Sequence, residues 1–159
     1  MIFYKIAGAL ILLLSGIIGA AYLNGALALR KRQSAAIEEW LRFLRGQIDC
    51  FSMPISDIFL LSGRERLLEC GYASDVMPRD FSEFLEHAEI YDRDIEDALA
   101  ELGASFGGCY REEQLKACER CIDAVSVRHQ EISSEMPKKK KLNATLCISA
   151  ALAVAILLL

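Results

Sequence analysis

The pattern of hydrophobic and polar positions divides the chain into three parts. Ile6–Leu29 is a run without a charged residue, closed by a basic cluster, and it is long enough to cross the roughly 30 Å hydrocarbon core of a bilayer as a helix. A second uncharged run, Leu142–Leu159, ends the sequence after four lysines. The pattern predicts transmembrane helices within residues 1–32 and 138–159, and a polar domain of residues 33–137 between them.

Within the polar domain, apolar residues recur at helical steps of three and four. A helix is expected from about Ser34 to Phe51, and Pro54 prevents its simple continuation. Ser56 or Asp57 is expected to cap a short second helix. Further helices are expected at about 65–70, after Asp80, through 95–106, and from about 112. The last of these follows a heptad-like seam of Leu115, Cys118, Ile122, Val125, His129, Ile132 and Met136.

Pro137 is expected to kink or break this last helix at the membrane surface. No alternating strand pattern extends beyond a few residues. The short connections between helices favour antiparallel neighbours. The sequence therefore predicts an all-α fold, a cytoplasmic antiparallel helical bundle flanked by an N-terminal and a C-terminal transmembrane helix.

The distribution of charge predicts how the chain lies across a membrane. All 22 acidic residues fall between Glu38 and Glu135. Basic clusters beside a span stay in the cytoplasm, which places the polar domain there and both termini on the far side. The same clusters are expected to meet anionic lipid at the membrane surface: Arg30, Lys31, Arg32, Lys138, Lys139, Lys140 and Lys141. A cleaved signal peptide is disfavoured, because the apolar run is long and a basic cluster follows it.

Two sets of residues are candidates for contacts with other proteins. Small residues let helices approach closely in lipid, although they are also common in any transmembrane span. The candidates for contacts between helices in the membrane are Gly8, Ser15, Gly19, Ala26, Ser149 and Ala153. The stretch Asp75–Glu101 carries ten acids against two arginines, and it is either a solvated helix face or a docking surface for a basic partner. The candidates for docking are Glu83, Glu86, Glu89, Asp94 and Asp97.

The sequence shows little sign of catalysis, and no cofactor is expected. The Cys118-x-x-Cys121 pair lies inside a predicted helix, whereas redox pairs of this kind start one. Zinc would need about four ligands, which Cys109, Cys118, Cys121 and His129 supply only if the chain folds back. No phosphate-binding loop is present, and an acidic domain disfavours nucleic acid. The six cysteines are expected to be reduced thiols in the cytoplasm.

The order of these features resembles the stage III sporulation protein AB family, over nearly the whole chain. Local matches are Leu44 to Ile48 followed by Met53-Pro54-Ile55, and Leu99-x-x-Leu102-Gly103-x-x-Phe106-Gly107 with Gln114 downstream. The chain departs from the family pattern at Gln47, where an acid is usual, at Phe106, which replaces a leucine, and at Leu142-Asn-Ala-Thr after the lysines.

The resemblance implies a role in the channel complex between mother cell and forespore, in the mother-cell (outer forespore) membrane. The family's cytoplasmic domain is similar to the helical repeat of type II secretion inner-membrane platform proteins, where such a domain couples a cytoplasmic ATPase to membrane components. By that analogy the protein is a non-enzymatic membrane adaptor. Two other hypotheses stay open at this point: a zinc- or thiol-dependent membrane protein using Cys118 and Cys121, and a small pore-forming membrane protein.

Overall fold

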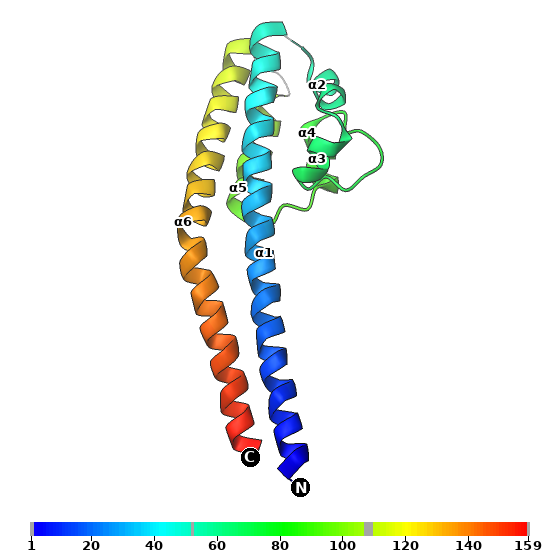
Figure 1. Ribbon diagram of the computed structural model, residues 1–159. Helices are drawn as coiled ribbons and strands as arrows, with labels where there is room; N and C mark the ends of the chain where they lie inside the picture. Colours follow the sequence, from blue (N-terminus) through cyan, green and yellow to red (C-terminus); the bar gives the residue numbers. More distant parts are fainter. Residues whose placement is uncertain (1, 52, 107–109, 159) are drawn as a thin grey trace. The chain divides into compact units, whose positions relative to one another are not determined.

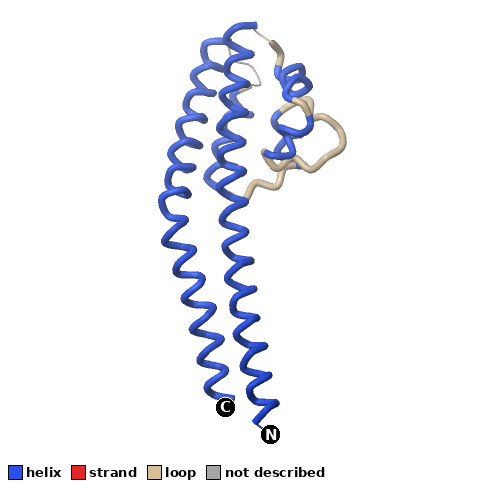
Figure 2. Tube along the Cα trace, in the orientation of Figure 1, coloured by secondary structure: helices blue, strands red, loops and turns tan. Residues whose placement is uncertain are grey.

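The chain folds into helices throughout the residues that the computed structural model describes, which are 2–51, 53–106 and 110–158. They are α1 (Ile2–Phe51), α2 (Ile55–Ser62), α3 (Arg64–Glu69), α4 (Phe81–His87), α5 (Arg93–Ser105) and α6 (Arg111–Leu158) (Figures 1 and 2). No strand occurs in these ranges, so the all-α prediction is confirmed. The side chains of residues 2–7, 9, 10, 13, 157 and 158 are outside the description, as are Gly107, Gly108 and Cys109.

Two local predictions were wrong, and a third was wrong in part. The helix expected from Ser34 begins at Ile2, because the residues joining the apolar run to it include no proline and no helix-ending glycine. Pro137 was expected to kink or break the last helix, and it does not break it, since α6 is continuous over 48 residues. A kink at Pro137 stays a prediction, because the ring removes one backbone hydrogen bond and crowds the preceding turn. α2 begins directly after Pro54 with no side-chain cap, and the Pro54 carbonyl accepts from the backbone N–H groups of Asp57 and Ile58.

The helices form two compact units. Unit 1 consists of residues 1–29 and 133–159, and unit 2 of Arg30–Ile132. In unit 1, α1 and α6 run antiparallel, and Gly16 permits a close approach: a Cβ at this position would lie 2.8 Å from the Cβ of Ala151 and 2.9 Å from the Cys147 carbonyl oxygen. Asn24 and Asn143 meet across the same pair of helices, with amide nitrogen and oxygen 3.5 Å apart.

The two long helices carry the apolar runs that were expected to cross a membrane. Among the residues that the structure describes, none is both long enough and apolar enough to cross a membrane. Both runs expected to span, Ile6–Leu29 and Leu142–Leu159, include positions outside the described side chains.

Unit 2 is organised around Trp40 on α1, whose side chain is completely buried. The distance between ring centroids is 5.6 Å from Trp40 to Phe59 of α2 and 5.2 Å from Trp40 to Phe84 of α4. The indole N–H of Trp40 donates a hydrogen bond to the Ser62 hydroxyl over 3.0 Å. From the predicted seam of α6, the side chains of Cys118, Ile122 and Val125 are buried and belong to the same hydrophobic core. One hydrophobic core therefore joins α1 and α6 to the four short helices.

Candidate functional site

A polar cluster in unit 2 is the most developed arrangement of functional groups in the described residues. We define the polar cluster as Arg30, Gln33 and Ser34 of α1, Asp92 before α5, and Arg128 and His129 of α6. The three α1 residues lie on one helix face, because positions three and four apart are neighbours on a helix. Each bonds a different part of unit 2.

Asp92 is the centre of the polar cluster. Its side chain is 2% exposed and accepts from the guanidinium groups of Arg30 and Arg128, with Nε distances to Oδ2 of 2.8 Å and 3.0 Å. Asp92 also caps α5, since Oδ1 accepts from the backbone N–H of Asp94 over 3.1 Å and of Ile95 over 3.4 Å. One carboxylate thus holds together α1, α5 and α6.

The two arginines also decide the ionisation of this carboxylate. Burial by itself raises the pKa of Asp92, but the hydrogen bonds and charges of Arg30 and Arg128 outweigh burial and hold the pKa below its ordinary value. Two cations around one carboxylate mean that Asp92 keeps a partner when either arginine is replaced. Asp92 is therefore ionised and tightly held at neutral pH.

Gln33 joins α1 to two loop segments. Its amide nitrogen donates to the carbonyls of Cys70 (3.2 Å) and Glu89 (2.6 Å), and its amide oxygen accepts from the Tyr91 backbone N–H over 2.9 Å. Gly71 makes this approach possible: its φ of +103° favours glycine, and a Cβ there would lie 2.6 Å from the Glu89 carbonyl oxygen. The side chain of Gln33 is therefore fully used in positioning the chain that leads into α5.

Ser34 and His129 form a serine–histidine pair that the sequence did not predict. The Ser34 hydroxyl donates to the Lys31 carbonyl over 2.8 Å, and its oxygen lies 2.7 Å from Nδ1 of His129. A hydroxyl has one hydrogen, so Ser34 can donate to only one of these two acceptors at a time. Ser34 is also 1% exposed, so no substrate reaches it. The pair links α1 to α6 and does not form a nucleophile.

The five docking candidates differ in their surroundings. Glu83 is half-buried and accepts from the Arg79 backbone N–H, and the Asp94 carboxylate lies 3.1 Å from Nε of Arg128. Glu86, Glu89 and Asp97 are exposed and make no ion pair within the described ranges. The acidic stretch is therefore not a uniform face: Asp92 serves the interior, and Glu86, Glu89 and Asp97 are the most accessible of the candidates.

The membrane-surface candidates are not equivalent either. Arg30 is bound to Asp92 and Arg32 pairs with Glu69 over 3.0 Å, while Lys139 pairs with Glu135 over 2.6 Å. The other lysines of the second cluster are exposed. The expected contact with anionic lipid stays a prediction, and Arg30 has an internal role that the charge pattern did not indicate.

The small-residue candidates lie largely outside the contact between α1 and α6. Ser15, Ala26, Ser149 and Ala153 are exposed, and nothing lies within 4 Å of a Cβ built on Gly8. Gly19 is 3.9 Å from the Cys147 sulfur by the same measure. The close contact instead uses Gly16 and Ala151, so a contact of the candidate residues with other helices stays a prediction.

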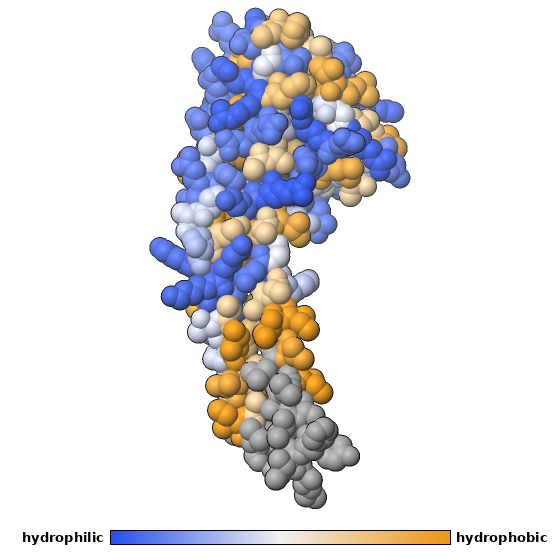
Figure 3. All heavy atoms as spheres, in the orientation of Figure 1, coloured by the Kyte–Doolittle hydropathy of each residue, from blue (hydrophilic) through white to orange (hydrophobic). Residues whose placement is uncertain are grey.

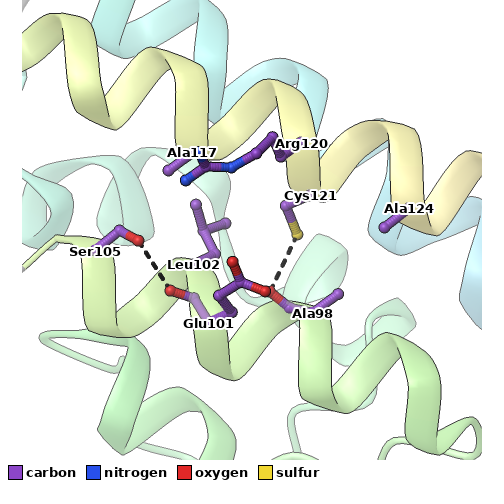
Figure 4. A pocket seen from close by; sticks show the side chains of 8 residues that line it. All are labelled: Ala98, Glu101, Leu102, Ser105, Ala117, Arg120, Cys121 and Ala124. Carbon is purple, nitrogen blue, oxygen red and sulfur yellow. Dashed lines mark hydrogen bonds between the residues drawn. The ribbon is translucent and has the colours of Figure 1, made fainter.

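The cysteine pair of α6 serves packing. Cys118 and Cys121 are buried, and burial raises the pKa of each thiol to about 12. Figure 4 shows Cys121 beside a hollow of about 50 Å³ between α5 and α6, where its sulfur donates to the Ala98 carbonyl over 3.5 Å. In the part of the chain that the structure describes, no three metal-binding side chains gather. Cys109 lies outside the described residues.

The polar cluster could not be predicted from the sequence, apart from one signal. Asp92 directly precedes α5, which is the position of a helix cap. Its pairing with Arg30, 62 residues away, and with Arg128, 36 residues away, is not visible in any local pattern.

Comparison with known proteins gives one match. The family model described as stage III sporulation protein AB matches residues 5–159, essentially the whole chain. No curated protein and no solved structure matches the chain.

Proposed function

The chain belongs to the stage III sporulation protein AB family and so has a role in stage III of spore formation; we propose that it acts there as a membrane-anchored adaptor. In this proposal unit 1 anchors the protein in the mother-cell membrane as two spans. Unit 2 lies in the cytoplasm and couples a secretion-type ATPase to the membrane components of a channel complex. The adaptor itself catalyses no reaction.

The observation that carries the proposal is the surface of unit 1. Large apolar side chains are exposed along both helices, among them Ile11, Ile17, Ile18, Leu142, Leu152 and Ile156. Figure 3 shows this apolar surface on unit 1 and a mainly hydrophilic surface on unit 2. Exposed apolar surface of this extent needs a partner or a membrane to cover it. Lipid is the covering that also agrees with the basic residues next to both apolar runs.

Two further observations favour an adaptor. The buried groups of unit 2 that chemistry might use, Asp92, Ser34 and the thiols of Cys118 and Cys121, are occupied in packing or in internal hydrogen bonds. Unit 2 also presents exposed carboxylates, which a basic surface on a partner would complement.

The membrane part of the proposal is tested by fractionation. Full-length protein in sporulating cells should remain with the membrane after alkaline carbonate extraction and leave it in detergent. An impermeant maleimide should label Cys50, which is exposed in unit 2, only after the membrane is opened. Release of the protein by carbonate would contradict anchoring, and labelling in sealed cells would reverse the orientation.

The adaptor part is tested by purification in mild detergent. A secretion-type ATPase and further membrane proteins should co-purify with the full-length chain. Lysine substitutions at Glu86, Glu89 and Asp97 should reduce recovery of the ATPase, whereas lysine at the exposed Glu112 and Glu113 of α6 provides the matched control. Equal ATPase recovery from both variants would remove the acidic face from the proposal, and a clean protein without an ATPase would contradict the adaptor role.

A further inference from the structure

The polar cluster lies at one end of unit 2. Arg30 is the first residue of this unit and Ile132 the last, so Arg30 and Arg128 hold α1 and α6 where both helices leave it. Both helices continue past these residues without interruption, α1 from Ile2 and α6 to Leu158. Contacts of the polar cluster therefore join α1 and α6 at this end of unit 2.

The contacts at this end differ in kind from those in the rest of unit 2. Along the middle of α1, Ile37, Leu41 and Leu44 are completely buried in a hydrophobic core. At the boundary the helices are joined by the carboxylate of Asp92 and by the Ser34–His129 hydrogen bond. Apolar packing tolerates small displacements, whereas a shared ion pair depends on one group that both arginines contact.

The geometry also determines what happens when the carboxylate is withdrawn. The Arg30 and Arg128 side chains are only 28% and 29% exposed, and each binds Asp92. Arg128 has further acidic partners in Asp94 and Glu131, but the ion pair of Arg30 in the described residues is with Asp92. Without that carboxylate, Arg30 loses this ion pair, and the negative charge that both arginines contact is gone.

We propose that Asp92 is a conformational latch. While it binds Arg30 and Arg128, it closes the end of unit 2 from which α1 and α6 leave. When the Asp92 carboxylate no longer contacts the two arginines, α1 and α6 separate at that end of unit 2, while the aromatic core around Trp40 stays packed. Opening of one part of a unit while the rest stays packed occurs because stability is not uniform across a folded unit. The proposal concerns unit 2 itself and holds whether or not the adaptor function is correct.

The test measures distances between spin labels in the full-length chain in detergent. One pair of labels, at Ala35 of α1 and Gln130 of α6, lies on exposed positions close to the latch. A reference pair, at Cys50 and at a cysteine replacing Glu113, lies at the opposite end of unit 2. Cys109 and Cys147 are replaced by serine in both labelled proteins, and the exposed Cys50 is also replaced by serine in the protein that carries the latch pair. The thiols of Cys70, Cys118 and Cys121 are protected from labelling by burial.

Asp92→Asn should lengthen and broaden the distance of the latch pair, with the reference pair and the Trp40 emission unchanged. Asp97→Asn, at an exposed position of α5, the helix that Asp92 caps, is the matched control and should change neither distance. Arg30→Gln retains Asp92 and its cap on α5, and should give a smaller broadening. Unchanged latch distances in a folded Asp92→Asn or Arg30→Gln protein would overturn the proposal. Loss of native Trp40 emission in both variants would also overturn it, because Asp92 would then stabilise the whole unit and not one end.

Discussion

Replacing Gly103 by alanine tests how closely α4 and α5 approach each other. A Cβ at Gly103 would lie 2.7 Å from the Cβ and 3.4 Å from the Cγ of Phe81. These atoms are next to the backbone of α4 and cannot rotate away, so the added methyl group must push the two helices apart. Overpacking of this kind costs about 1–3 kcal/mol. Alanine recovers at most about 1 kcal/mol through its higher helix propensity, so the expected net effect is destabilising.

Gly46 of α1 provides the matched control, because nothing lies within 4 Å of a Cβ built there. Gly46→Ala adds the same methyl group and gains helix propensity without a clash, so it should stabilise the protein by up to about 1 kcal/mol. The difference between the two variants therefore measures the overpacking cost. Urea unfolding of the full-length chain in detergent can be followed by fluorescence, since Trp40 is the one tryptophan and lies in the core of unit 2. Equal shifts of the midpoint in the same direction would refute the close contact.

Three further predictions concern the polar cluster, the cysteines and unit 1. The pKa of Asp92 is lowered on folding, so the contribution of this carboxylate to stability is complete above its unfolded pKa of about 4 and is lost as pH falls through its folded pKa. The difference in unfolding free energy between the wild type and Asp92→Asn, measured with urea, should therefore shrink below about pH 4. A difference that stays constant with pH would contradict the lowered pKa. Cys118 and Cys121, with thiol pKa values raised to about 12 by burial, should react with a maleimide far more slowly than the exposed Cys50 until urea is added, and mass spectrometry of the labelled peptides gives the rates. Gly16→Leu should separate α1 from α6 in unit 1 and abolish the disulfide crosslink between the native Cys147 and a cysteine introduced at Gly19, whose Cβ would lie 3.9 Å from the Cys147 sulfur. Gly25→Leu, where nothing lies within 4 Å of an added Cβ, should leave the crosslink intact.

Local patterns predicted most of the helices, because helix formation depends on residues that are close in sequence. The spacing of Ile37, Leu41, Leu44 and Ile48 indicated the buried face of α1, and all four are buried. The seam through Cys118, Ile122 and Val125 was predicted in the same way. The helix expected from Ser34 instead continues the preceding apolar run, because no break signal separates the two and helix propagation is cooperative. At Pro137 a local break signal is present, yet α6 continues through it.

The sequence by itself determined the helical class, the two apolar runs with their basic neighbours, and the family to which the chain is similar. Only the tertiary structure decided which charges are internal. Arg30 looked like part of a membrane-surface cluster and Asp92 like one of ten surface acids, yet they bind each other in the interior of unit 2 with Arg128. A hydrophobic pattern has a period that can be read along one helix, whereas an ion pair joins residues at arbitrary separations. Its partners are known only when the fold has brought α1, α5 and α6 together.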